Sequence, residues 1–484
     1  MLQRNTFLTA LLQRYSSTVI VQISGFIVGL VVAKLLGPEM LGYWGIFQII
    51  TGYFSYSNLG ATNGLTRDLG IALGKGEKKQ INRIIGAAHA VQLTLPFVAT
   101  FVLFFVALFY DSPINWILVT AGIYGFIQLY EVTLVRVINS FEQHKKLALL
   151  HGGKALLSII IIIPFVYIYD LEGRLIAAVV LALIVFGITW KILPAKMSLK
   201  FDMSDIKSLI RIGFPIGMAG FLMSNFFLVD RLVIASFLTV EELGFYVFAF
   251  YLVMVVKSIK QTVSNILYQR QNIIFGEDGP EKKRRLYIIT KSTAFFATDL
   301  TGILSGILLI IFSFAVKYLM PEYLESIPLT FIIVFSQVMG SINVLNTVGK
   351  HLDYLKLMGF ALLINIILSI TFVSIWGLLG IAYATFMAFL IHNIIVNYYN
   401  LRFFNLSFVE SIGVIFRIIG VPVFCFLIAY LIELALFQYY SGIFISDIVL
   451  VIVLCLGYLI LTAPLLFFLK QHISVLNRIK LLKS

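Results

Sequence analysis

Several charged side chains lie inside long apolar segments of this 484-residue sequence. Asp230 and Arg231, for example, are adjacent within the apolar stretch FFLVDRLVIASFL at residues 226–238. If such segments cross a bilayer, a charge at its centre costs at least about 2.5–3.5 kcal/mol and therefore faces an internal cavity or a partner. The candidates on this criterion are Lys34, Glu131, Arg136, Lys154, Asp230, Arg231, Lys257, Lys260, Lys291 and Asp299.

Some of these charges have a simpler interpretation. Lys34, Arg136, Lys154 and Lys291 are near the ends of their apolar segments, from which long side chains reach the lipid headgroups. The Asp230–Arg231 pair could stabilise helix packing instead of facing a cavity. The sequence leaves both interpretations open.

Two polar stripes recur at a fixed offset of 202 residues. Each has positions spaced by 0, 3, 7 and 8 residues, which places its members on one helical face. We expect the stripes to form two walls of one aqueous cavity, whose lysines attract an anion, although such residues also hydrogen-bond helix to helix. The stripes are Ser55, Asn58, Thr62 and Asn63, and Lys257, Lys260, Ser264 and Asn265.

The composition requires a membrane environment for these segments. The chain is 60% hydrophobic and 12% charged, with a mean hydropathy of +0.99. Its apolar runs do not alternate with polar residues, so they indicate transmembrane helices rather than strands of a barrel. The net charge of +13 is spread over short clusters between these runs, without the pattern of a nucleic-acid surface, so no nucleic-acid partner is expected.

The apolar runs predict an all-α membrane protein of about fourteen spans. Alternate connections are rich in Lys and Arg, and only Arg174 and Lys317 break this pattern. By the positive-inside rule, both termini are then cytoplasmic. The expected spans are near residues 15–36, 41–66, 84–109, 114–138, 149–169, 174–192, 209–237, 242–266, 287–316, 327–349, 355–375, 378–398, 413–434 and 447–469.

The same offset of 202 residues aligns longer stretches of sequence. It pairs VVAKLLGPEMLGYW with VIASFLTVEELGFY, matching Gly42 with Gly244. Because six spans separate the partners, the halves share an orientation, as in transporters built from parallel repeats. We therefore expect two pseudo-symmetric six-helix lobes and two further helices, with an N-lobe at 1–200, a C-lobe at 201–405, and the last two spans with a cytoplasmic tail at 406–484.

Motifs for catalysis or metal binding are weak. LGKGEKK is one residue too short for a phosphate-binding loop, and the six histidines form no HExxH motif. The two cysteines, Cys425 and Cys455, lie in separate apolar runs. We therefore predict no catalytic residue, no metal site, no cofactor and no enzyme activity.

Three stretches of the sequence resemble those of a known family. AKLLGPEMLGYWGIFQ and NLGATNGLTRD in the first half, with VDRLVIASFLTVEELGFYVFAF in the second, resemble the polysaccharide-exporter branch of the multidrug/oligosaccharidyl-lipid/polysaccharide (MOP) transporter superfamily. The resemblance implies a V-shaped bundle of fourteen helices in a bacterial inner membrane. It further implies a flippase that moves an undecaprenyl-diphosphate-linked oligosaccharide, such as an O-antigen of lipopolysaccharide, to the outer leaflet by alternating access.

The charged residues suit that function, because a diphosphate and polar sugars require a wet, cationic chamber. The expected substrate-binding residues are Arg231, Lys257, Lys260, Asn63, Asn265, Arg67 and Lys34. Asp230 and Glu131 are assigned to ion coupling, with H⁺ or Na⁺ as the driving ion. Arg67 could instead anchor its helix at the interface.

The expected partners are the lipid-linked oligosaccharide, membrane lipids and a glycan polymerase machinery. Two other functions remain as alternatives. One is a multidrug or metabolite antiporter of the same superfamily, for which twelve spans and acidic cation sites are expected. The other is a membrane-embedded glycan polymerase or ligase, which usually has a large extracytoplasmic loop.

Overall fold

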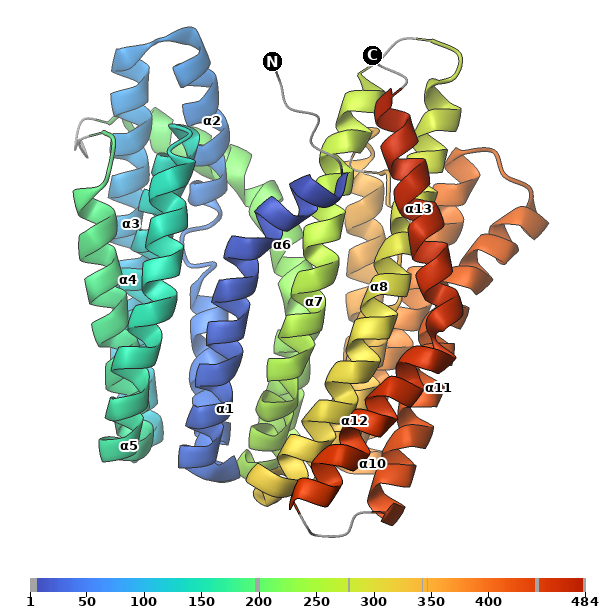
Figure 1. Ribbon diagram of the computed structural model, residues 1–484. Helices are drawn as coiled ribbons and strands as arrows, with labels where there is room; N and C mark the ends of the chain where they lie inside the picture. The colour runs from blue at the N-terminus through green and yellow to red at the C-terminus, as the bar shows by residue number, and fades with distance from the viewer. Residues whose placement is uncertain are drawn as a thin grey trace. The chain divides into compact units, whose positions relative to one another are not determined.

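The computed structural model describes residues 7–195, 201–276, 279–341, 343–345, 347–439 and 444–481, and these ranges are helical apart from short connections (Figure 1). The first half contains α1 (Phe7–Phe54), α2 (Ala61–Lys75), α3 (Lys78–Ala107), α4 (Ile114–Ser140), α5 (His144–Lys191) and α6 (Met203–Phe237). The remainder contains α7 (Val240–Phe275), α8 (Lys282–Leu319), η1 (Pro321–Tyr323), α9 (Ser326–Val338), α10 (His351–Phe403), α11 (Phe408–Tyr439), α12 (Phe444–Leu461) and α13 (Ala463–Leu481). The all-α membrane fold expected from the sequence is confirmed.

Three of the longest helices contain a break. α1 has a non-helical residue at Gly37, with φ 72° and ψ 173°, and α10 has one at Gly377, with φ 55° and ψ −134°. Glycine tolerates the positive φ that both breaks need. α5 breaks at Tyr169 and Asp170.

The breaks in α5 and α10 reverse the chain. A Cβ placed on Gly173 would lie 1.9 Å from the carbonyl oxygen of Phe165, and one on Gly380 would lie 2.1 Å from that of Phe372. Residues eight apart in a straight helix are separated by about 12 Å along the axis. Each of these helices is therefore a hairpin of two antiparallel arms, and a side chain larger than hydrogen at Gly173 or Gly380 would force the arms apart.

The number of spans agrees with the expectation once these breaks are counted. By length and composition, eight of the described helices could cross a membrane, or ten if each of two bent pairs is one span. Division of α1, α5 and α10 at their breaks adds three segments, and the short apolar helix α9 adds one more. The described residues thus contain the fourteen segments predicted from the sequence.

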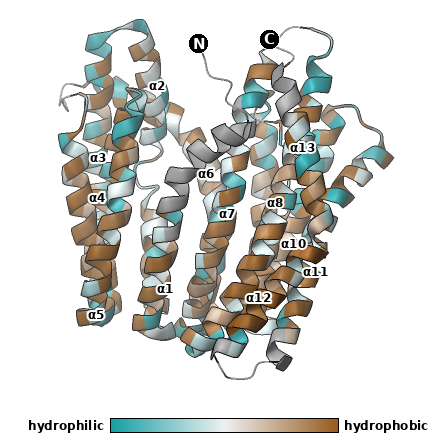
Figure 2. Ribbon diagram, in the orientation of Figure 1, coloured by the Kyte–Doolittle hydropathy of each residue, from teal (hydrophilic) through white to brown (hydrophobic). Residues whose placement is uncertain are grey.

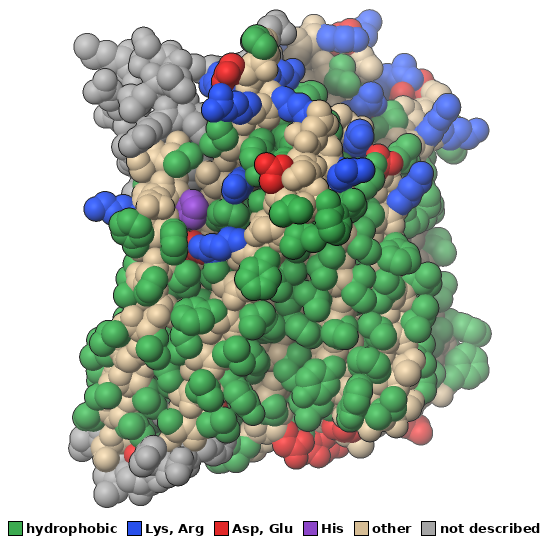
Figure 3. Space-filling model, turned by 90° about the vertical axis from the view of Figure 1, so that its right-hand side faces the viewer, with side chains coloured by type: hydrophobic (Ala, Val, Ile, Leu, Met, Phe, Trp, Pro, Cys, Tyr) green, Lys and Arg blue, Asp and Glu red, His purple; other side chains and the backbone are tan. Residues whose placement is uncertain are grey.

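Apolar residues run along these helices, and polar residues gather toward their ends (Figure 2). On the face seen in Figure 3, basic side chains collect at one end of an apolar band, together with some acidic ones, whereas the charged side chains visible at the opposite end are acidic. This distribution matches the alternation of basic and non-basic connections in the sequence.

The chain forms two compact units, and the first comprises Ile23–Val247. In it α3 packs on α4, α4 on α5, and α2 on α6. A buried apolar cluster that includes Leu65, Leu69, Ile85 and Val137 joins α2, α3 and α4.

Glycines allow close approach of helices in the same unit. A Cβ on Gly42 would lie 1.8 Å from the carbonyl oxygen of Val240, and a Cβ on Gly244 would lie 1.8 Å from that of Pro38. Both pairs are related by the offset of 202 residues, so the contact is reciprocal. The reciprocal contact relates positions that the sequence repeat aligns.

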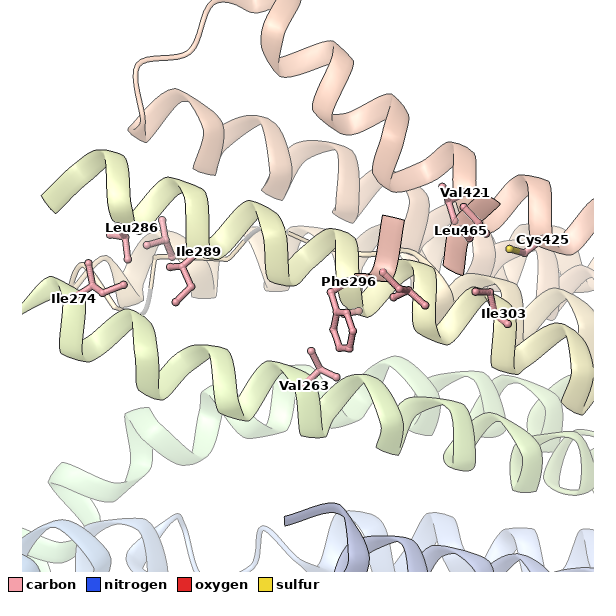
Figure 4. Close-up of a cluster of buried hydrophobic side chains, with 12 residues drawn as sticks. Val263, Ile274, Leu286, Ile289, Phe296, Ile303, Val421, Cys425 and Leu465 are labelled. Carbon is pink, nitrogen blue, oxygen red and sulfur yellow. The ribbon is translucent and has the colours of Figure 1, made fainter. Parts of the chain in front are cut away.

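The second unit contains the chain from Phe248 onward together with the beginning of α1. Within it, α8 is central and packs against α9, α11, α12 and α13. Figure 4 shows its core, in which Phe296 and Ile303 of α8 lie among Val263 of α7, Val421 of α11 and Leu465 of α13. The division of the chain into lobes at 1–200 and 201–405, with 406–484 separate, stays a prediction.

Candidate functional site

A polar cavity of about 360 Å³ lies in the first unit, among α1, α4 and α5. Its volume is in the range of pockets that bind small ligands. Polar side chains from three helices converge on it, which is unusual inside an apolar helix bundle. The residues that line it are Trp44, Phe47, Gln48, Thr51, Gly52, Ser55, Tyr124, Gln128, Glu131, Lys154, Ile162, Arg174, Ala178, Leu181, Ala182 and Val185.

Two cations and one carboxylate face this cavity. The Nζ atom of Lys154 lies 3.8 Å from the Oε2 atom of Glu131, whose side chain is buried. The guanidinium carbon of Arg174 lies 3.6 Å from the centre of the Trp44 ring. A guanidinium over an indole face is attracted by the electrons of the ring.

A second cavity of about 240 Å³ adjoins the first, and Thr51, Ser55 and Gln128 line both. Ser55, Asn58, Thr62 and Asn63 all line this second cavity, together with Arg136 of α4. The polar stripe expected on the second span therefore lies along a cavity wall, but the prediction that it occupies one helical face is wrong. Residues 55–60 form turns between α1 and α2, so Ser55 and Asn58 precede α2, whereas Thr62 and Asn63 lie in it.

The same stripe also holds helices together. The Nε2 atom of Gln92 in α3 donates to the hydroxyls of Thr62 and Thr133, at 3.2 and 2.7 Å. Asn58 donates to Thr62, whose hydroxyl lies 3.3 Å from that of Thr133. Cavity lining and hydrogen bonding between helices, which were alternatives at the level of sequence, thus coexist at residues 55–63, which form the turns before α2 and its first residues.

Asp230 and Arg231 have different partners although they are adjacent in α6. The buried carboxylate of Asp230 accepts a hydrogen bond from the Tyr246 hydroxyl at 2.7 Å. Arg231 donates from Nη1 to the Oε1 atom of Gln48 at 2.7 Å. Gln48 lines the first cavity and Arg231 does not, so Arg231 contacts the cavity wall from behind, through the side chain of Gln48.

Lys260 lies at the end of a helix in the second unit. Its Nζ atom donates to the carbonyl oxygens of Gln337, at 3.1 Å, and of Met339. These carbonyls are at the C-terminal end of α9, where the helix leaves acceptors unsatisfied and where a positive charge is favourable. Lys257 is half-buried one turn away, and the side chain of Asn265 lies outside the described residues. The substrate-binding role assigned to this stripe stays a prediction.

The two remaining predicted cations are exposed. Lys34 is exposed in the first arm of α1. Arg67 in α2 pairs with Asp68 at 3.2 Å, and its side chain is 54% exposed. Their assignment to substrate binding also stays a prediction.

Arg174 was missed as a site residue by sequence reasoning, although the sequence carried a signal for it. Arg174 and Lys317 are the only basic residues that break the alternation of basic connections. Arg174 lines the cavity, and Lys317 pairs with Glu433 at 3.2 Å with both side chains buried. A basic residue on the side that otherwise lacks positive charge can thus mark an internal role.

The second unit contains a further buried charge cluster. Both oxygens of Asp299 in α8 lie 2.9 Å from nitrogens of Arg417 in α11, a bidentate pair. The Nε2 atom of His472 in α13 lies 3.6 Å from the same carboxylate. This cluster joins α11 and α13 to α8, the helix on which they pack.

The residues that line the two cavities lie within a part of the chain that matches a known family. Residues 31–270 match a family described as "Polysaccharide biosynthesis protein", a range that includes every residue lining both cavities. No curated protein matches the chain.

The fold is similar to that of solved transporters. The lipid II flippase MurJ in an inward closed conformation has a TM-score of 0.63 at 14% identity, with 93% of this chain and 99% of MurJ covered. An inward-facing multidrug resistance MATE family transporter of the MOP superfamily has a TM-score of 0.62 at 14% identity, covering 81% of this chain and 95% of its own. For an outward-facing MATE transporter the TM-score is 0.52 at 15% identity, with coverages of 80% and 95%.

At these identities the likeness shows the fold, and the matched family adds the link to polysaccharide synthesis. The resemblance inferred from the sequence motifs is confirmed: residues 31–270 match a polysaccharide biosynthesis family, and the fold resembles that of the lipid II flippase MurJ and of a transporter of the MOP superfamily.

Proposed function

We propose that this protein is a flippase, which moves an undecaprenyl-diphosphate-linked oligosaccharide from the cytoplasmic to the outer leaflet of a bacterial inner membrane by alternating access. The observation that carries the proposal is the pair of adjoining polar cavities, which lie within the residues that match a polysaccharide biosynthesis family. MurJ, which has a similar fold, is a lipid II flippase.

The charge of the cavities suits an anionic substrate. Lys154, Arg174 and Arg136 line them, against the single carboxylate of Glu131. Lysine binds a phosphate as a point charge, and the fork of an arginine binds it through two parallel N–H groups. The amides of Gln128 and the other polar side chains of the walls supply the neutral donors and acceptors that sugar hydroxyls require.

Glu131 supports an ion-coupling step at the same place. The side chain of its partner Lys154 is 40% exposed and lines the cavity, so an incoming diphosphate can compete with Glu131 for the ammonium group. A carboxylate that loses its partner inside an apolar bundle is stabilised by binding a cation. We therefore assign Glu131 to the uptake of H⁺ or Na⁺ when the substrate binds.

The experiment is disruption of the gene followed by analysis of the lipid-linked oligosaccharide in each leaflet. In sealed vesicles of known orientation, a membrane-impermeant oxidant of sugars reports which leaflet contains the glycan. We expect the intermediate to accumulate in the cytoplasmic leaflet, and wild-type protein to restore the outer pool. An unchanged leaflet distribution with altered drug sensitivity would instead identify an antiporter, and shortened glycans with normal translocation would identify a polymerase.

The cavity is tested in the same assay with matched variants. Lys154→Gln combined with Arg174→Gln removes both cations of the larger cavity and should leave most of the intermediate in the cytoplasmic leaflet. Lys145→Gln removes an exposed cation from the same helix, α5, without changing the cavity, and should behave as wild type. Equal translocation by the double variant and the control would exclude this cavity as the substrate site.

A further inference from the structure

An apolar groove of about 170 Å³ lies between the two antiparallel arms of α5. Its lining from the first arm falls on one helical face, and its lining from the second arm is aliphatic. Apart from its two lysines it offers no polar side chain. The groove is lined by Lys146, Leu149, Leu150, Gly153, Lys154, Leu157, Val185, Ile188 and Ile192.

This groove is continuous with the larger polar cavity. Lys154 and Val185 line both, so the ammonium group of Lys154 stands where an apolar wall meets a polar one. A ligand that occupied both spaces would need a polar part, an apolar part and an anionic group at the junction.

The second lysine is at the other end of the groove. The Nζ atom of Lys146 donates to the carbonyl oxygen of Ile192 at 3.4 Å, where the second arm of α5 ends. Eight residues separate Lys146 from Lys154, which is roughly 12 Å along a helix. Between them the groove presents only aliphatic side chains and Gly153.

Gly153 keeps the groove open. A Cβ on this residue would have no heavy atom within 4 Å, so the space beside it is free. The neighbouring Gly152 is equally unobstructed but does not line the groove. The two adjacent glycines therefore differ in position relative to the groove and not in local crowding.

We propose that this groove binds the segment of the substrate's polyprenyl chain that is next to the diphosphate, with the diphosphate at Lys154 and the saccharide in the polar cavity. This inference rests on the proposed function and specifies how its substrate is held. The occupant is a polyprenyl diphosphate, because its single hydrocarbon chain, its anionic group and its polar saccharide match the three surfaces in their order along α5. A two-chain phospholipid has no large polar part to place beyond Lys154.

The test uses undecaprenyl diphosphate with a photoreactive diazirine on its chain, added to the purified full-length protein in vesicles of phosphatidylethanolamine and phosphatidylglycerol. After irradiation, we expect labelled peptides from residues 146–157 and 185–192. Unlabelled undecaprenyl diphosphate should reduce this labelling, and additional phosphatidylglycerol should not. Labelling that both lipids reduce equally would show that ordinary membrane lipid occupies the groove, and would overturn the inference.

Two pairs of variants locate the chain and the diphosphate separately. Gly153→Leu fills the groove and should reduce labelling about tenfold, the effect of losing about 1.4 kcal/mol of binding, whereas Gly152→Leu should leave it unchanged. Lys154→Gln should weaken binding by a similar factor, and Lys154→Arg, which keeps a phosphate-binding cation, should retain it.

Failure of this inference and failure of the proposed function give different results. If gene disruption traps the intermediate in the cytoplasmic leaflet but Gly153→Leu is labelled as strongly as Gly152→Leu, the protein is a flippase that holds its lipid elsewhere. If Gly153→Leu loses the photolabel and Gly152→Leu keeps it, but gene disruption does not change the distribution of the lipid-linked oligosaccharide between the leaflets, the groove binds a polyprenyl diphosphate in a protein that does not translocate it.

Discussion

The contact between Gly306 of α8 and Tyr458 of α12 predicts that Gly306→Ala, which adds one methyl group, lowers the stability of the folded protein strongly. Tyr458 is fully buried, and its hydroxyl donates to the carbonyl oxygen of Gly302 at 2.9 Å. A Cβ on Gly306 would lie 2.1 Å from the ring carbon Cζ and from the hydroxyl oxygen of Tyr458. Gly302 and Gly306 are spaced as in the small-residue motifs that let membrane helices approach closely.

The size of the effect follows from this geometry. Ordinary contacts of a Cβ begin at 3.4 Å, so Gly306→Ala requires a displacement of about 1.3 Å between α8 and the Tyr458 ring. Overpacking of this kind costs about 1–3 kcal/mol. Tyr458→Phe keeps the ring and loses one hydrogen bond, which in a membrane bundle is worth about 0.6 kcal/mol on average. We therefore expect Gly306→Ala to be clearly more damaging than Tyr458→Phe.

The assay is the thermal unfolding midpoint of the purified variants in detergent, with membrane expression as a second readout. Gly457→Ala is the matched control, because a Cβ next to Tyr458 in sequence, on Gly457, would meet open space. In a Tyr458→Leu background the cost of Gly306→Ala should fall, since the clashing ring is gone. If Gly306→Ala is as stable as Gly457→Ala, or if its cost is unchanged by Tyr458→Leu, the packing argument is wrong.

Three further predictions concern charged side chains. Arg174→Ala should lower translocation more than Arg174→Lys in the leaflet assay, because lysine keeps a cation beside Trp44; equal loss in both would show that the guanidinium itself is required. Lys260→Met should lower the unfolding midpoint, because two carbonyls at the end of α9 lose their donor at a cost of about 1–3 kcal/mol; an unchanged midpoint would show that water replaces it. Arg83→Gln breaks a pair with Asp205 whose nitrogen and oxygen lie 3.0 Å apart; since exposed ion pairs contribute little, the midpoint should not change, and a measurable drop would mean that this pair anchors α3 to α6.

Much of the fold was predictable because hydrophobic length is a local property. Each run of apolar residues implied a span, and the expected spans 15–36 and 41–66, and 355–375 and 378–398, meet near the breaks at Gly37 and Gly377. The sequence repeat was also informative, since it aligned Gly42 with Gly244 before their reciprocal contact was known.

The candidate site was only partly predictable, because the partner of a charged residue is a tertiary property. Helical periodicity grouped Asn58, Thr62 and Asn63, and all three line one cavity, although Asn58 lies in the turn before α2 and not on its face. The same reasoning applied to Lys260 could not foresee the end of α9, which lies 77 residues further along the chain. In the sequence, Arg174 was only an exception to the alternation of basic and non-basic connections. The fold of α5 is what places its guanidinium over the Trp44 ring.

The tight reversals of α5 and α10 also have a practical consequence. A chain that reverses within one or two residues has no loop into which a peptide could be inserted without separating the two helical arms. Epitope tags, protease sites or reporter fusions placed at Tyr169–Asp170 or at Gly377 should therefore abolish folding rather than report sidedness. Topology mapping at these two ends would need single cysteines and small thiol reagents, and homologues that differ in length should carry their insertions elsewhere.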